Sequence, residues 1–248
     1  MRDYLIICPL VFIAGFIDAV AGGGGLISLP AYFITGMPAH NCVATNKMSS
    51  FMGTSIATVK YGRDGFIPWK IAAFCIPCAF LGSAIGANAA LMLPDRIFKI
   101  ILIVIIPLTG LLVLTRKNIL NPTRSYSAPA TTVISAACAL FIGVYDGFYG
   151  PGTGTFLLLL LTGVAGMDLT KANGLTKAVN LTTNLSAFVV FLLSGQVMIP
   201  LGFVAGLFNI AGNYIGATRF EKNGSAIVKP VLITVLTVFF IKIIMELN

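Results

Sequence analysis

Charged side chains are scarce in this chain of 248 residues. Asp, Glu, Lys and Arg together make up only 10% of it, whereas 57% of the residues are hydrophobic. A water-soluble domain carries about 25% charged residues, so this chain cannot cover itself with polar surface, and the soluble globular class is excluded. This shortage and a mean hydropathy of +0.96 predict an all-α, polytopic transmembrane helical bundle.

Residue types that carry metal or nucleophilic chemistry are also nearly missing. The chain has one histidine, His40, and its five cysteines are scattered through apolar runs. It contains no HExxH, no GxSxG and no GxxxxGK[ST] segment, which argues against a metalloprotease, a serine hydrolase and a P-loop enzyme. We therefore expect no metal, no cofactor and no enzymatic activity.

An internal repeat is present instead. The segment FIAGFIDAVAGGGG at 12–25 aligns with LFIGVYDGFYGPGTG at 140–154, and Asp18 then matches Asp146 with an offset of 128. Repeats of this kind are typical of secondary transporters.

The repeat divides the chain into two halves. Beyond the first aligned segment the offset becomes 130, and Lys47 matches Lys177. We predict a first transmembrane repeat at 1–115, a cytoplasmic linker at 116–129 and a second transmembrane repeat at 130–248.

Each half is predicted to contain five hydrophobic segments. The second segment of each half has only 11 or 14 residues, too few to cross about 30 Å of hydrocarbon at about 1.5 Å per residue. Since glycines precede both, we expect broken or re-entrant helices there. The ten ranges are 4–21, 26–36, 43–62, 70–93 and 97–115, then 130–149, 153–166, 172–194, 198–219 and 226–246.

Basic residues indicate the orientation in the membrane, which is how we interpret the net charge of +8; no nucleic acid is implied. The linker carries Arg116, Lys117 and Arg124, and should face the cytoplasm. Arg63 and Lys70 flank the loop at 63–69, whereas its counterpart at 195–198 is uncharged. Conversely, the loop at 219–229 holds three basic residues, whereas its counterpart at 94–99 has two, beside Asp95. This exchange favours an odd number of crossings per half and an inverted repeat. The alternative is four crossings plus a re-entrant element per half, with parallel repeats.

The two glycine clusters are candidate anion-binding sites. A helix that restarts at Leu26 or at Thr153 presents free N–H groups and a positive dipole end, and glycine lets a ligand approach the amides closely. The alternative is that glycines only permit tight helix packing. The residues assigned to anion binding here are Gly23, Gly24, Gly25, Gly152 and Thr153. The spaced glycines, for which we expect the packing role, are Gly82, Gly86, Gly212 and Gly216.

Ionisable residues occupy equivalent places in the two halves. Asp18 and Asp146 end the first segment of each half, and Lys47 and Lys177 lie near the start of the third. Such residues cost at least about 2.5–3.5 kcal/mol at the bilayer centre and are functional candidates by default. We expect the lysines to neutralise an anion, and the aspartates to couple transport to protons or to pin the lysines. Helix–helix hydrogen bonding, snorkelling and a sodium site at the aspartates are alternatives.

Polar residues continue along the same segments. Asn46, Ser50 and Thr54 step by four, and so do Asn180 and Asn184, which places each set on one helix face. A polar face turns toward something other than lipid, so we assign Asn46, Asn180 and Asn184 to substrate binding. Three further asparagines could join these polar residues, although we prefer a packing role for them: Asn88, Asn209 and Asn213.

Four segments together resemble the sulfite exporter TauE/SafE family. They are GFIDAVAGGGGLISLP, ATNKMSSFMGTSIATVKYG, FLGSAIGANAA and GLTKAVNLTTNLSAFVVF, in this order over nearly the whole chain. The resemblance implies a multi-span permease of the bacterial or archaeal inner membrane that handles sulfite, sulfoacetate or other organosulfonates. Pro151 and Thr153 depart from the clearest glycine pattern, which would make the second cluster narrower or stiffer.

We therefore predict a secondary transporter of a small anion, sulfite or an organosulfonate, that works by alternating access in a prokaryotic inner (plasma) membrane. The expected partners are the anionic solute and the lipid bilayer, and the sequence is compatible with proton or sodium coupling and with a homo-oligomer. The alternatives are an anion or cation channel, and a sodium- or proton-coupled carrier of a small carboxylate.

Overall fold

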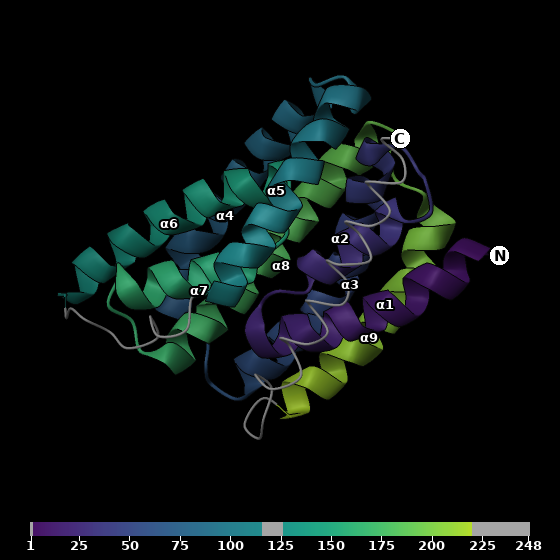
Figure 1. The fold of residues 1–248 in the computed structure, drawn as a ribbon. Coiled ribbons are helices and arrows are strands. Elements are labelled where there is room, and N and C mark those ends of the chain that lie inside the picture. Colours follow the sequence, from purple (N-terminus) through teal and green to yellow (C-terminus); the bar gives the residue numbers. More distant parts are fainter. Residues whose placement is uncertain (1, 116–125, 220–248) are drawn as a thin grey trace.

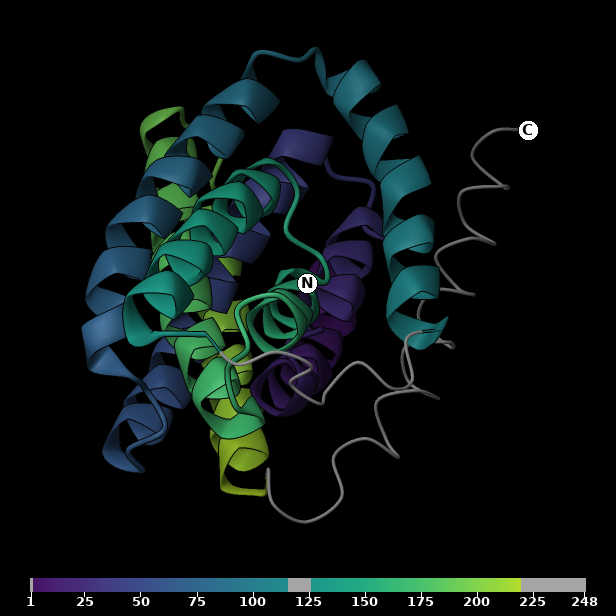
Figure 2. The same ribbon diagram turned by 90° about the vertical axis from the view of Figure 1, so that its left-hand side faces the viewer.

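The computed structural model describes residues 2–115 and 126–219, and this part of the chain is all-α (Figures 1 and 2). The expected segment at 226–246 and most of the linker lie outside the described residues. Each helix agrees with an expected segment to within four residues at either end. The helices are α1 (Arg2–Ala21), α2 (Gly25–Phe33), α3 (Ala39–Arg63), α4 (Trp69–Leu91), α5 (Asp95–Thr115), α6 (Ala128–Phe148), α7 (Thr153–Gly163), α8 (Leu169–Leu193) and α9 (Ile199–Arg219).

Helix length and composition separate two kinds of helix. Among the described helices, α1, α4, α6, α8 and α9 are long and apolar enough to cross a membrane. Helix α3 is as long as α8, at 25 residues, but its polar face lowers its hydropathy. Helices α2 and α7 have 9 and 11 residues, and therefore extend for only about half of a bilayer core of about 30 Å.

Spaced glycines bring two pairs of helices together, backbone to backbone. A Cβ atom on Gly86 would lie 2.0 Å from a carbonyl oxygen of α6, and one on Gly216 would lie 2.5 Å from a carbonyl oxygen of α1. The expected packing role of these glycines is confirmed, and Figure 1 shows α1 beside α9 and α4 beside α6. The four contacts join Gly82 to Leu140, Gly86 to Val144, Gly212 to Phe12 and Gly216 to Phe16.

Each of the two helix pairs combines one helix from the first half of the chain with one from the second half. Residue numbers rise together along both members of each pair, so α1 runs parallel to α9, and α6 runs parallel to α4. Each pair joins a helix before the linker to one after it. Corresponding contact residues differ by 128 between α1 and α6 and by 130 between α4 and α9, which are the two offsets of the sequence repeat.

One end of the molecule gathers the start of α3 and two helix connections. The backbone N–H of His40 donates to Asp95 Oδ1 over 3.0 Å, and its ring Nδ1 lies 2.9 Å from the same oxygen. The side chain of Asn41 donates to the carbonyl of Gln196 over 2.7 Å. The α4–α5 and α8–α9 connections therefore both lie beside the start of α3.

The opposite end gathers the end of α3 and the start of α8. A Cβ atom on Gly174 would lie 2.1 Å from the carbonyl oxygen of Phe66, which follows α3. Helices α3 and α8 therefore run in opposite directions.

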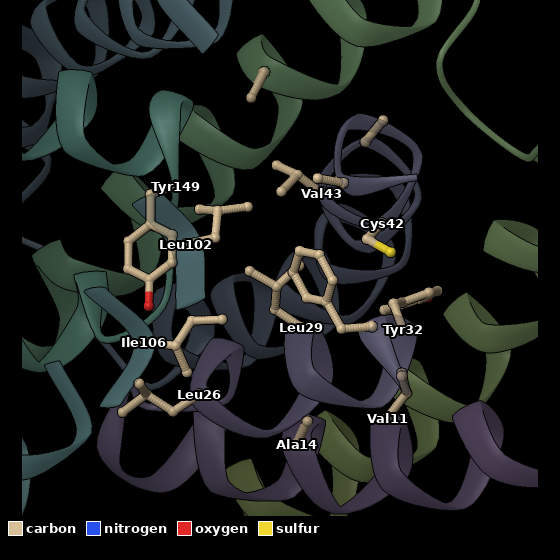
Figure 3. Close-up of a cluster of buried hydrophobic side chains, with 14 of the residues drawn as sticks. Val11, Ala14, Leu26, Leu29, Tyr32, Cys42, Val43, Leu102, Ile106 and Tyr149 are labelled. Carbon is tan, nitrogen blue, oxygen red and sulfur yellow. The ribbon is translucent and has the colours of Figure 1, made fainter. Parts of the chain in front are cut away.

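The short helix α2 is enclosed by protein. Every residue from Leu26 to Phe33 is buried, and the hydroxyl of Tyr32 donates to Ser49 of α3 over 2.9 Å. Figure 3 shows Leu26 and Leu29 in one apolar cluster with Ile106 of α5 and with Tyr149. Such cover is required of a helix that stops at membrane depth, because lipid cannot bond its terminal backbone groups.

We predict that Gly86→Ala destabilises the protein. The added methyl group collides with the α6 backbone, and overpacking typically lowers the free energy of unfolding by about 1–3 kcal/mol, which exceeds the gain of about 1 kcal/mol in helix propensity. The measurement is the thermal unfolding midpoint in detergent. Ala73→Leu on the exposed face of α4 is the control and should leave the midpoint unchanged.

Candidate functional site

The two glycine clusters touch each other. The N–H of Thr155 donates to the carbonyl of Gly22 over 3.2 Å, and a Cβ atom on Gly154 would lie 2.5 Å from the same oxygen. A Cβ atom on Gly25 would lie 3.0 Å from Cα of Pro151. The break between α1 and α2 therefore packs directly on the break between α6 and α7.

The breaks between these helices require glycine both for its backbone conformation and for its lack of a side chain. Gly22, Gly150 and Gly152 have φ angles of +72°, +101° and +84°, a region that other residues rarely adopt. A Cβ atom on Gly150 would also lie 2.8 Å from Nζ of Lys47. The break before α7 thus leaves room for a lysine that comes from the other half.

Each aspartate lies at the start of the short helix of its own half. The carboxylate of Asp18 accepts the backbone N–H of Gly24, and Asp146 Oδ1 accepts the hydroxyl of Thr153 over 2.7 Å. A negative charge is favourable there because the helix dipole is positive at its N-terminus. The protein's own carboxylates therefore occupy part of the donor set that we expected to hold an anion.

The lysines cross over to the aspartates of the other half. Lys47 Nζ lies 2.8 Å from Asp146 Oδ2, and these side chains are only 2% and 3% exposed. Lys177, which is fully buried, donates to the main-chain carbonyl of Asp18 and lies 6.0 Å from the ring centroid of Tyr61. We call Asp18, Lys47, Asp146 and Lys177 the charge cluster.

A cavity of about 30 Å³ lies between the glycine clusters and the polar faces of α3 and α8. One water molecule needs at least about 10–15 Å³, so this conformation leaves space for little more than water. The cavity does not touch Gly23 or Lys177. The expected site residues that line it are Asp18, Gly24, Gly25, Asn46, Lys47, Asp146, Gly152, Thr153, Asn180 and Asn184.

The polar face of α3 contributes further lining. Ser50 and Thr54 line the cavity together with Asn46, so this face turns toward the cavity as expected. The Oδ1 atom of Asn46 is buried and has no hydrogen-bond partner among the described residues. A buried acceptor of this kind calls for a water or a ligand donor.

Asn209 is a cavity residue for which we preferred packing over a place among the polar residues of the site. It lines the cavity, and its Oδ1 accepts the side-chain N–H of Asn213 over 2.6 Å. A Cβ atom on Gly53 would lie 2.0 Å from that oxygen, so the pair fits only against a glycine. The spacing of the two asparagines, four residues apart on an otherwise apolar helix, is the sequence pattern that could have revealed it.

A family comparison identifies the class of protein. The model of the family described as "Sulfite exporter TauE/SafE" matches residues 7–243. The chain belongs to the TauE/SafE family. The resemblance inferred from the four sequence segments is thereby confirmed.

Relatives of this TauE/SafE protein carry transporter names. The "Probable membrane transporter protein ORF9" of a Sinorhizobium species is 34% identical over 95% of this chain and 90% of its own length. A "Probable membrane transporter protein" of Haemophilus influenzae is 35% identical over 90% of this chain and 87% of its own. The "Probable membrane transporter protein YfcA" of Escherichia coli is 30% identical over 96% of this chain and 88% of its own length. No solved structure shows a significant match to the chain.

TauE/SafE membership settles the broad class of this protein. It is a multi-pass membrane protein of a transporter family with bacterial relatives, and the prediction that it is not an enzyme is confirmed by that membership.

We predict that Asp146→Leu alone is strongly destabilising and that Lys47→Met restores stability in the double variant. Removing one partner leaves a buried charge unpaired, which costs about 3–5 kcal/mol, whereas apolar replacement of both partners is often neutral or stabilising. Thermal unfolding midpoints in detergent measure both effects.

The exposed pair of Lys60 and Asp64, at 3.1 Å, is the control for this comparison. Asp64→Leu should change the free energy of unfolding by only about 0–1 kcal/mol. Equal losses from Asp146→Leu and Asp64→Leu would contradict the assignment of Lys47 and Asp146 as a buried pair.

Proposed function

We propose that this protein is a secondary transporter that moves a small anion, sulfite or an organosulfonate, by alternating access. The observation that carries the proposal is the contact between the two glycine clusters beside the ammonium group of Lys47. That contact joins two helix N-termini and one cation at a single cavity, a combination of donors and positive charge that suits an oxyanion.

The chemistry of the lining supports an anion with several oxygens. Lys47 supplies a compact charge with three donors, and the amides of Asn180 and Asn184 supply neutral N–H groups. The short helices α2 and α7 direct the positive ends of their dipoles to the same place. A sulfite or sulfonate group presents three oxygens, enough to use all these kinds of donor at once.

The arrangement of the helices supports two inverted repeats. Helix α2 returns from the glycine contact toward the start of α3, and α7 returns toward the start of α8, at the opposite end. Helices α2 and α7 would then be re-entrant elements that return to opposite faces of the membrane from the glycine contact. Inverted repeats around a central site are the arrangement used by many alternating-access transporters.

The size of the cavity also supports alternating access. A space of about 30 Å³ is smaller than a sulfonate with its hydration, so substrate entry requires the lining elements to separate. Movement of one repeat against the other would open the cavity first to one face and then to the other. An open pore would conduct without this step.

Lys47→Met tests the proposed anion site. We expect uptake of labelled sulfite or sulfonate into proteoliposomes, compared per folded protein because Lys47→Met also leaves Asp146 unpaired, to fall by about tenfold or more, since a hydrogen bond to a charged group contributes about 1.5–3 kcal/mol. Lys60→Met, at the exposed pair with Asp64, should transport normally. Normal transport by Lys47→Met would overturn the role of Lys47.

The substrate class is tested by thermal shift. Purified protein is heated with sulfite, sulfate, thiosulfate, sulfonates or carboxylates, since a ligand that binds only the folded state raises the melting temperature. We expect the largest rise with a sulfur oxyanion. A rise with carboxylates alone would favour a carboxylate carrier, and single-channel currents with non-saturating flux would identify a channel.

The repeat orientation is tested with two cysteines placed 130 residues apart, at equivalent positions after α3 and α8. In a cysteine-free background, Asp64→Cys should react with an impermeant maleimide from the cytoplasmic face, and Ser194→Cys from the other face, because both residues are exposed and follow antiparallel helices. Parallel repeats would place both cysteines on the same face.

A further inference from the structure

The charge cluster is balanced without any ligand. It contains two carboxylates and two ammonium groups, contributed by α1, α3, α6 and α8. Lys47, Asp146 and Lys177 are almost completely buried, and Asp18 is partly exposed, toward the cavity that it lines. An anion that enters this largely buried site alone would leave it with a net negative charge, which is unfavourable away from water.

The position best suited to the anion is already filled by Asp146. Its Oδ2 lies 2.8 Å from Nζ of Lys47, and its Oδ1 accepts the hydroxyl of Thr153 at the start of α7 over 2.7 Å. These donors are the ones that an oxyanion would need. The carboxylate of Asp146 is therefore an internal competitor of the substrate.

We propose that the protein takes up one proton, on Asp146, for each univalent anion that it binds, so that anion and proton share the site as a neutral pair. This inference rests on the proposed function. The proton goes to a carboxylate oxygen of Asp146, the ion pair with Lys47 is broken, and the ammonium group then binds the anion. The total charge of the site is the same before and after binding.

A divalent anion requires a second proton for the same balance. Asp18 is the remaining carboxylate of the cluster, and it also lines the cavity. Two aspartates therefore set an upper limit of two protons per substrate, one on Asp146 and one on Asp18.

Few other titratable groups face Asp146. Lys47 comes from α3 and Asp18 from α1, and Lys177 of α8 contacts the main chain of Asp18, whereas α7 has no charged residue and the only one in α4, Lys70, lies at its outer end. On α6 itself the hydroxyl of Tyr145 donates to the carbonyl of Pro151. The charge cluster thus contains the groups whose ionisation decides anion binding.

The direct test uses wild-type protein and a pH indicator. Detergent-purified transporter in weak buffer is mixed with methanesulfonate, which stays univalent, or with sulfate. We expect one proton to disappear from solution for each methanesulfonate bound, and two for each sulfate. Anion binding without proton uptake would overturn the inference and leave the proposed function intact.

The pH dependence of affinity gives the second readout. Since the complex holds one proton more than the free protein, affinity for methanesulfonate should fall by up to about tenfold for each unit of rising pH. In Asp146→Asn the competitor is uncharged, so binding should be tighter at high pH and nearly independent of pH. Asp64→Asn, at an exposed ion pair, should behave like wild type.

The remaining outcomes distinguish the two proposals. If neither anion binds wild-type protein at any pH, the anion-transport function itself fails. If binding requires sodium in place of protons, or if Asp146→Asn keeps the full pH dependence, the proton inference alone fails. The wild-type proton measurement decides the matter even if Asp146→Asn does not fold.

Discussion

The contact between the two glycine breaks is the constraint on which the rest of the structure depends. A helix that stops inside an apolar medium leaves backbone groups that lipid cannot bond, and here each break is covered by the other. The carbonyl of Gly22 receives the N–H of Thr155, while the aspartates bind donors at the starts of α2 and α7. Each break therefore depends on the other for its hydrogen bonds and its cover.

The crossed pairing of charges follows from the same contact. Once the breaks meet, Asp146 pairs with Lys47 of the other half, and Lys177 donates to the main-chain carbonyl of Asp18. Each half therefore supplies a partner for a buried lysine of the other half, as each helix pair needs a partner from across the linker. This mutual dependence gives a physical reason why the two halves of the chain pack as one unit.

Much of the fold could be predicted because the relevant physics is local. Hydrophobic length gave the helix bounds to within four residues, and glycine spacing identified the close contacts of Gly86 and Gly216. The pairing of helices could not be predicted, because parallel packing of α1 on α9 depends on shape along two distant surfaces. The choice between packing and the cavity could not be made for Asn209 for the same reason, since only the folded structure brings it to the cavity.

The sequence by itself determined that this is a helical membrane protein with a repeated pattern of glycine, aspartate and lysine, because composition and periodicity are properties of the chain alone. Only the tertiary structure decided that the lysines bind the aspartates of the opposite half, and that Lys177 lies outside the cavity while Lys47 lines it. Distances between residues far apart in the chain are fixed by packing. Packing also makes the two halves unequal, since it brings Lys47 but not Lys177 to the cavity.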